Sequence, residues 1–355
     1  MERLTIAFFG PTNSGKSTLV NAIAGQEVSL VSPVPGTTTD AVRKLIELPG
    51  LGPCVLIDTA GLDDDSVLGQ ERQRLTRRIL DETDIAVVLE IPGQAGYDGG
   101  LIGDLAAAGI PTVIYRRAES VESLLTRIAA ARPKEEERYL TGSLVKAGST
   151  VLLVMPQDSE APKGRLILPQ VQVLRELLDR GCVPVCCTPE SLRSAIKSVT
   201  PDLVITDSQV FGLVNETIPA QWPLTSFSVL LAGAKGDLNV YLEGARAIDT
   251  LKPGDRVLIA EACTHVPDTE DIGRVKIPAL LRKRAGELSI SIAAGNDFPE
   301  DLSPYALIIH CGACVATRTL VRSRIRKALL AGVPITNYGI ALAHLNGILG
   351  RISMP

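Results

Sequence analysis

Cysteine and histidine side chains gather in two short stretches in the last third of the chain. The first stretch is Cys263-Thr-His265, and the second is His310-Cys311-Gly-Ala-Cys314. Thiolates bind soft metals, and a Cys-x-x-Cys pair lets one turn of chain reach a single tetrahedral ion or two irons of a cubane. The pattern therefore predicts an iron–sulfur cluster with one open position or a closed zinc site with three cysteines and a histidine. Buried thiols beside structural histidines are the third alternative.

Each stretch follows an apolar run that is typical of a β-strand, at residues 255–262 and 305–309. The carboxyl ends of neighbouring parallel strands meet at one edge of an open α/β sheet, where ligands bind. Two adjacent parallel strands would therefore bring both stretches together. Glu261 and Asp271 flank the first stretch and are candidates for outer-shell partners or a fourth ligand. His344 lies on an apolar helical segment with no cysteine nearby, and we expect it to be structural.

A full phosphate-binding loop, Gly10-Pro-Thr-Asn-Ser-Gly-Lys-Ser17, follows a strand predicted at residues 4–9. Its glycines let backbone amides surround a phosphate, and the next helix, through residues 18–24, presents the positive end of its dipole. Lys16 would neutralise the β- and γ-phosphates, and Ser17 would ligate Mg²⁺. The predicted nucleotide-binding residues of this segment are Gly10, Asn13, Ser14, Gly15, Lys16, Ser17 and Thr18.

Two further motifs follow in the order expected of a GTPase. Thr38 lies in Gly36-Thr-Thr-Thr-Asp40 and would be the switch threonine that ligates Mg²⁺ and the nucleotide. Asp58 and Gly61 close the strand-and-loop sequence Val55-Leu-Ile-Asp-Thr-Ala-Gly61. Asp58 would hold Mg²⁺ through water, and the Gly61 N–H would sense the γ-phosphate. The predicted catalytic residues are Lys16, Thr38, Asp58 and Gly61, with GTP and Mg²⁺ as cofactors.

This set of motifs resembles the translation-factor-like GTPases of the Era and TrmE kind. In the potassium-dependent members, an asparagine at the place of Asn13 helps to bind K⁺, which makes K⁺ a further expected cofactor. The guanine-recognition motif N-K-x-D is missing after the strand at 110–115, where Arg116-Arg-Ala118 stands instead. The helix at 121–131 looks like the last helix of such a domain, so the intervening stretch is expected to be deleted. We therefore expect weak GTP binding with little preference over ATP.

Composition excludes several classes of protein. The chain has 355 residues, of which 45% are hydrophobic and 21% are charged, and this predicts several globular domains. The formal net charge of −4 gives no electrostatic footprint for nucleic acid. No apolar run reaches the roughly 18 residues that span a bilayer, and the N-terminus has no signal-peptide layout. We predict a cytoplasmic protein without nucleic-acid or membrane partners. Its seven cysteines indicate metal or catalytic thiols rather than disulfides, with Cys54, Cys182, Cys186 and Cys187 expected to be packing residues in or beside strands.

The predicted fold is α/β with three domains. A shortened P-loop GTPase-like domain with a mostly parallel sheet is expected over residues 1–135. A small parallel α/β unit is expected over 145–220, and a third α/β domain over 222–355 carries the cysteines. A unit as small as the middle one buries only about 60% of its chain surface alone, so self-association is an expected remedy.

The whole chain resembles the HydF family, the FeFe-hydrogenase maturation GTPases. Beyond the phosphate loop and Asp-Thr-Ala-Gly, the resemblance rests on seven stretches spread over the second and third domains. These are Ala161-Pro-Lys-Gly-Arg-Leu-Ile-Leu-Pro-Gln-Val-Gln172, Thr206-Asp-Ser-Gln209, Thr225-Ser-Phe-Ser228, Glu261-Ala-Cys-Thr-His265, Asp271-Ile-Gly-Arg-Val-Lys-Ile-Pro278, His310-Cys-Gly-Ala-Cys314 and Val333-Pro-Ile-Thr-Asn-Tyr-Gly339.

The resemblance implies a GTPase domain, a dimerisation domain and a 4Fe-4S domain. Cys263, Cys311 and Cys314 would hold the cluster, and His265 and His310 are candidates for its exchangeable fourth site. It also implies a homodimeric scaffold or carrier that receives the diiron subcluster from radical-SAM maturases and delivers it to apo FeFe-hydrogenase. The alternative is a stand-alone K⁺-dependent switch GTPase with a zinc-stabilised C-terminal domain, and the acidity of the chain counts against its acting on tRNA or ribosomes.

Overall fold

The computed structural model describes most of the chain, which divides into two compact units, Met1–Glu136 and Glu137–Pro355. The described residues are 3–11, 13–25, 42–59, 78–90, 98–133, 139–157, 164–262, 271–295, 297–314 and 316–355. Within those ranges no helix has both the length and the apolar character needed to cross a membrane. Four predicted site residues lie outside them: Thr38, Gly61, Cys263 and His265.

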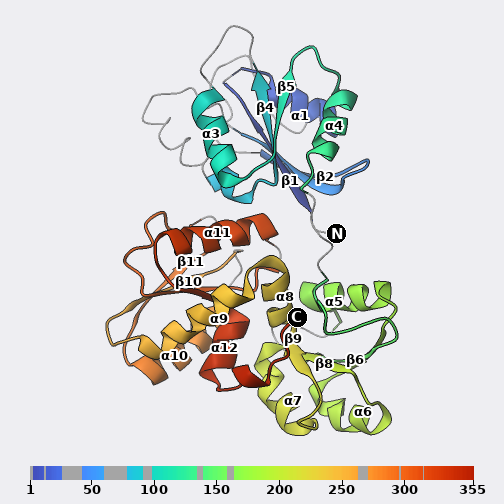
Figure 1. Cartoon of the computed structure of the whole chain (residues 1–355), viewed down its shortest axis with the longest axis vertical. Coiled ribbons are helices and arrows are strands. Elements are labelled where there is room, and N and C mark those ends of the chain that lie inside the picture. The colour runs from blue at the N-terminus through green and yellow to red at the C-terminus, as the bar shows by residue number, and fades with distance from the viewer. Residues whose placement is uncertain are drawn as a thin grey trace. The chain divides into compact units, whose positions relative to one another are not determined.

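The first unit contains one five-stranded sheet with helices on both faces (Figure 1). Its elements are β1 (Leu4–Phe9), α1 (Lys16–Ala24), β2 (Val42–Leu48), β3 (Gly52–Asp58), β4 (Ile85–Glu90), α3 (Asp98–Ala108), β5 (Thr112–Arg116) and α4 (Val121–Ala130). The strand order is β2-β3-β1-β4-β5, and every neighbouring pair is parallel except β2 with β3. The predicted P-loop domain with a mostly parallel sheet is thereby confirmed.

Each face of this sheet has its own apolar core. On one face, Phe8 of β1 belongs to a buried cluster with Leu19 of α1 and Leu124 of α4. On the other face, Phe9 of β1 belongs to a second cluster with Leu105 of α3. The central strands are therefore buried on both sides, as parallel strands usually are, and the loops at their carboxyl ends start from fixed positions.

A short connection joins β5 to α4. Only residues 117–120 separate the strand from the helix, and the Ser120 side chain caps α4 by accepting a hydrogen bond from the Ser123 N–H at 3.2 Å. Among the described residues, β5 is the last strand at this edge of the sheet. The connection has no room for a long insertion, in line with the predicted loss of the guanine-recognition stretch.

The second unit contains two four-stranded sheets, both wholly parallel. The first of them has the order β7-β6-β8-β9. Its elements are β6 (Thr150–Val154), α5 (Leu168–Asp179), β7 (Val183–Cys187), α6 (Leu192–Ser198), β8 (Leu203–Thr206), α7 (Phe211–Thr217), β9 (Leu224–Ser226) and α8 (Phe227–Lys235), with short 3₁₀ turns at Pro189–Ser191 and Ser208–Val210. Gln170 is buried at the start of α5, and its side-chain amide donates a hydrogen bond to the carboxylate of Asp207, which follows β8.

The other sheet of this unit has the order β11-β10-β12-β13 and carries the cysteines. Its elements are α9 (Leu238–Arg246), β10 (Arg256–Ala260), α10 (Ile277–Ala285), β11 (Ser289–Ala293), β12 (Leu307–His310), α11 (Arg318–Leu330), β13 (Ile335–Asn337) and α12 (Tyr338–Leu345), with a π turn at Ile272–Lys276 and 3₁₀ turns at Ala247–Thr250 and Leu349–Arg351. β10 pairs directly with β12 in parallel, so the predicted adjacency of the two cysteine-bearing strands is confirmed.

The two sheets of the second unit share an apolar core. Leu152 of β6 belongs to the same cluster of buried side chains as Leu258 of β10 and Ile308 of β12. The start of α12 also lies tightly against α8, because a Cβ atom at Gly339 would come 2.3 Å from the Ser228 Oγ. The boundary predicted at residues 220–222 precedes β9, which pairs with β8, so it falls within the first of these sheets and inside one compact unit.

Candidate functional site

The phosphate loop leaves β1 at the carboxyl edge of the first sheet and enters α1. Asn13 and Gly15 have φ values of 60° and 94°, in the left-handed region that glycine adopts freely and other residues rarely do. At Gly10 a Cβ atom would lie 2.9 Å from the Ser14 Oγ, so the loop closes tightly on itself. The Ser14 Oγ is buried and has no hydrogen-bond partner among the described residues. The backbone thus has the tight turn that the motif predicts.

Two charged side chains lie beneath this loop. The Lys16 Nζ is buried and donates to the carbonyl oxygens of Gly10 at 2.9 Å and Pro11 at 2.7 Å. The Ser17 Oγ donates to the Asp58 Oδ2 at 2.6 Å, which joins the start of α1 to the end of β3. The other carboxylate oxygen of Asp58 is buried with no partner in the described part of the chain. Oxygen donors so arranged suit a hard divalent cation, and they fit Mg²⁺ beside a nucleotide phosphate.

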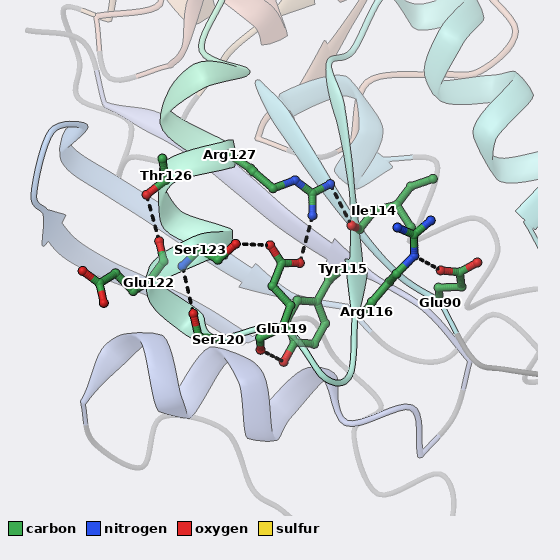
Figure 2. A network of polar contacts seen from close by, with 10 residues as sticks. All are labelled: Glu90, Ile114, Tyr115, Arg116, Glu119, Ser120, Glu122, Ser123, Thr126 and Arg127. Carbon is green, nitrogen blue, oxygen red and sulfur yellow. Dashed lines mark hydrogen bonds and ion pairs between the residues drawn. The ribbon is translucent and has the colours of Figure 1, made fainter.

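A polar network fills the connection between β5 and α4 (Figure 2). The Glu119 carboxylate accepts hydrogen bonds from the Ser123 Oγ at 2.7 Å and from the Arg127 Nη1 at 2.8 Å. Arg127 also donates to the Ile114 carbonyl oxygen at 3.0 Å. Partial burial raises the pKa of Glu119, but the hydrogen bonds from Ser123 and Arg127 outweigh it and hold the pKa below its ordinary value. The carboxylate that follows β5 is therefore used to hold α4 against the strand.

The cysteine centre lies at the carboxyl edge of the β10–β12 pair. Cys311 follows β12 directly, and its N–H donates to the Ala260 carbonyl oxygen at 2.9 Å. The Cys311 Sγ in turn accepts the N–H of Ala262 at 3.0 Å and the N–H of Ala313 at 3.4 Å. Hydrogen bonds to sulfur favour the thiolate, which is the form that binds metals. Ala262, the last described residue before the first cysteine stretch, therefore contacts the second stretch at this edge.

His310 is the last residue of β12, and it is buried. Its Nδ1 lies 2.8 Å from the Cys311 carbonyl oxygen, and its Nε2 lies 3.0 Å from the Arg324 Nη1. Because a guanidinium only donates, Nε2 must accept and Nδ1 must carry the proton. Burial, and then the charge of Arg324, lower the pKa of His310 to about 3, so the ring is neutral. With both nitrogens engaged, the ring as placed offers no lone pair to a metal.

Arg324 of α11 contacts this histidine and several backbone carbonyls, and no sequence motif indicated its role. Besides His310, its guanidinium donates to the carbonyl oxygens of Glu261 at 3.2 Å and of Gly295. Its Cζ lies 4.9 Å from the centre of the Phe298 ring. This buried arginine ties the ends of β10, β11 and β12 together, which a helical pattern alone could not reveal.

Two carboxylates bracket the segment that contains Cys263 and His265. The buried Glu261 accepts two hydrogen bonds from Arg274, at 3.2 Å from Nε and 2.7 Å from Nη2. Asp271 caps the turn that follows by accepting the Arg274 N–H at 2.8 Å. Both carboxylates therefore hold Arg274 in the turn at 272–276, and their outer-shell role stays a prediction.

His344 lies apart from the cysteines. Its Nε2 is 2.9 Å from the Asp249 Oδ1, and that carboxylate also pairs with Arg284 at 2.6 Å. This contact supports the structural role predicted for His344. In the described residues no three His, Cys, Asp or Glu side chains form a group that could hold a metal ion. Cys263 and His265 lie outside those residues, so the predicted ligand set stays a prediction.

Comparison with protein families assigns the chain in three segments. Residues 5–101 match the 50S ribosome-binding GTPase model, which makes the first unit a GTPase domain. Residues 140–236 match the hydrogen maturase F dimerization domain, and residues 239–355 match the hydrogen maturase F tetramerization domain. The last two segments together cover more than half of the chain. The chain belongs to the hydrogen maturase F family, and both matched segments support self-association.

Curated relatives match the GTPase part of the chain. The tRNA modification GTPase MnmE of Methylobacterium sp. (strain 4-46) is 38% identical over 144 residues, which are 37% of this chain and 33% of that protein. MnmE of Neisseria meningitidis serogroup C / serotype 2a is 41% identical over 98 residues, covering 27% and 22%. The chain thus spans a third or less of these relatives. Aquifex aeolicus Era bound to GDP.AlF4- covers 84% of this chain and 97% of its own, with 17% identity and a TM-score of 0.29, too low to bear on the fold.

Proposed function

We propose that this protein is a scaffold or carrier in FeFe-hydrogenase maturation that holds a 4Fe-4S cluster and binds GTP. The observation that carries the proposal is the hydrogen bond from the Ala262 N–H to the Cys311 Sγ at 3.0 Å. Ala262 directly precedes Cys263 in the sequence, so this bond links the chain next to the first cysteine stretch with the second stretch. Cys263, Cys311 and Cys314 are the proposed cluster ligands.

The surroundings of Cys311 suit such a cluster. When bound, a cubane held by three thiolates supplies one exchangeable iron position. The protein contributes two backbone N–H groups to the Cys311 sulfur, and hydrogen bonds of this kind tune a cluster's reduction potential. His310 supports the site from behind through Arg324 rather than as a ligand. His265 is therefore the histidine that we propose for the fourth position.

The cargo and partners follow from the family. We propose that the protein acts as a homodimer, receives the diiron subcluster from radical-SAM maturases and passes it to apo FeFe-hydrogenase. The matches to hydrogen maturase F dimerization and tetramerization domains support this role. An open coordination position fits a carrier, because a saturated cluster could not readily take up and release cargo.

The first unit would bind GTP with Mg²⁺ and hydrolyse it slowly. On nucleotide binding, Lys16 would exchange its loop carbonyls for phosphate oxygens, and Ser17 with Thr38 would ligate Mg²⁺. Asp58 would hold the ion through water with its free oxygen, and the Gly61 N–H would meet the γ-phosphate. Asn13, held in a left-handed conformation within the loop, is the proposed K⁺ ligand.

Anaerobic reconstitution with iron and sulfide tests the proposal. The wild-type protein should turn brown, absorb broadly at about 400 nm and carry a full complement of iron and sulfide. Cys311→Ser and Cys314→Ser should lose most of the iron. Cys186→Ser, which changes an exposed thiol on β7, is the matched control and should keep it. A Cys311→Ser variant with full iron would refute the ligand assignment, and a colourless zinc protein would favour the alternative function.

The fourth position has its own test. Replacing His265 by alanine should change the EPR signal of the reduced cluster, or its response to added imidazole, more than the iron content. His310→Gln should leave that response unchanged, because both ring nitrogens of His310 are engaged by the protein. A response lost only in the His310 variant would reverse the assignment.

A further inference from the structure

A buried lysine lies against the turn that carries Cys311 and Cys314. Lys235 is the last residue of α8, and only 5% of its surface is exposed. Its Nζ donates to the carbonyl oxygens of Ala313 at 2.8 Å, Cys314 at 3.1 Å and Ala316 at 2.8 Å. Burying an ammonium group is costly unless polar groups compensate it. The three carbonyl oxygens supply that compensation, so this contact fixes the lysine against the turn.

The turn needs such support. Its described residues between β12 and α11 form neither helix nor strand, and Ala313 has a φ of 50°, a conformation that a residue with a Cβ atom disfavours. Ala313 also donates its N–H to the Cys311 Sγ at 3.4 Å. Ala313 thus accepts a hydrogen bond from Lys235 with its carbonyl oxygen and donates one to the Cys311 sulfur with its N–H. Loosening the lysine contact would free Ala313, and with it a hydrogen bond to the sulfur.

The lysine comes from a distant part of the chain. α8 lies in the segment that matches the dimerization domain, and the cysteine turn lies 78–81 residues further on, in the segment that matches the tetramerization domain. At its other end, α8 places Phe227 and Leu230 in the buried cluster with Val173 of α5. One helix therefore runs from the core of the dimerization sheet to the cysteine turn.

We propose that Lys235 is a positioning residue for the iron–sulfur cluster. It holds the turn so that the sulfurs of Cys311 and Cys314 are presented together, and its ammonium offsets the negative charge of the thiolates. The inference rests on the proposed cluster function. It adds a residue outside the cysteine stretches, supplied by the dimerization segment, to the apparatus that holds the cluster.

Hydrogen–deuterium exchange of the apoprotein tests the contact without any cluster. Lys235→Met keeps the length of the side chain and removes its donors, while Lys235→Arg keeps a cation. Amides of residues 311–317 should exchange at least about tenfold faster in Lys235→Met, with a smaller change in Lys235→Arg, because hydrogen bonds from a charged donor are lost. Lys197→Met, which changes an exposed lysine on α6, should match the wild type. Unchanged exchange in Lys235→Met would overturn the inference.

Reconstituted proteins test the role toward the cluster. Lys235→Met should release iron to a chelator about tenfold faster than the wild type and should have a more negative midpoint potential, because a nearby positive charge is gone. Lys235→Arg should recover part of both effects. If the wild type takes up a cluster, and Lys235→Met has the same rate of iron release and the same midpoint potential, the role of Lys235 is refuted while the proposed function stands. If the wild type takes up no cluster, the proposed function fails and the inference with it.

Discussion

Two loops of this protein are held by a buried lysine in the same way. At the phosphate loop, Lys16 donates to the carbonyl oxygens of Gly10 and Pro11, and at the cysteine turn, Lys235 donates to those of Ala313, Cys314 and Ala316. Both loops leave the carboxyl end of a buried parallel strand. The difference lies in where the lysine comes from: Lys16 is five or six residues from its acceptors, whereas Lys235 is 78 to 81 residues away.

That difference separates a ligand-binding lysine from a structural one. The local lysine sits in a loop whose amides are arranged for phosphate, so its carbonyl contacts can be exchanged for a nucleotide. The distant lysine is anchored by a helix whose other end lies in an apolar core. Its contacts cannot be exchanged without moving that helix. One site is therefore built to respond to a ligand, and the other to keep a fixed shape.

The largest effect is expected from Lys16→Ala. The change removes the charge-assisted hydrogen bonds to the β- and γ-phosphates, each worth about 1.5–3 kcal/mol, so GTP affinity should fall at least about a hundredfold. Titration with a fluorescent GTP analogue would measure it. Lys235→Met should bind the nucleotide like the wild type. Equal losses in both variants would contradict the division between the two lysines.

The next effect concerns the fixed shape of the cysteine edge. Arg324→Met should lower the free energy of unfolding of the apoprotein by about 2–4 kcal/mol. The buried His310 Nε2 would lose its donor, and the carbonyls of Glu261 and Gly295 would each lose a hydrogen bond from a charged group. Arg326→Met, on the exposed side of the same helix, should change it by less than about 0.5 kcal/mol. Urea denaturation measures both, and similar values for the two variants would deny Arg324 this role.

Local patterns carried most of what could be predicted from the sequence. The phosphate loop, the strand before it and the pairing of β10 with β12 depend on neighbouring residues or on apolar runs, and all three are confirmed. The contacts of Lys235 and Arg324 depend on residues far along the chain. A buried lysine at the end of an apolar helix has the same local pattern as an exposed one, so no spacing rule could single it out. The contact between His310 and Arg324 was not predicted for the same reason, because Arg324 lies fourteen residues away on a different element.

The nucleotide site also allows a sharper test of base recognition. Glu119 is the carboxylate that follows β5. One of its oxygens accepts a hydrogen bond from Ser123 and the other from Arg127, so in this arrangement neither pairs with guanine. The affinities for GTP and ATP should therefore agree within about tenfold, the value of one such hydrogen bond. Calorimetric titration with both nucleotides measures the ratio. Glu119→Gln should leave it unchanged, whereas a ratio above a hundred that collapses in this variant would make Glu119 the guanine-recognition residue.

The smallest expected effect is a stimulation of GTP hydrolysis when K⁺ replaces Na⁺. Asn13 stands in the phosphate loop in a left-handed conformation, one residue before Ser14, whose buried hydroxyl has no partner in the described part of the chain. A monovalent cation bound beside the phosphates would stabilise the charge that develops in the transition state, as an arginine finger does elsewhere. The rate should rise severalfold in K⁺, and Asn13→Ala should abolish the rise while Lys235→Met keeps it. Equal rates in both salts would refute the assignment of Asn13 as a K⁺ ligand, and Lys16 and Mg²⁺ would then be the cations beside the phosphates.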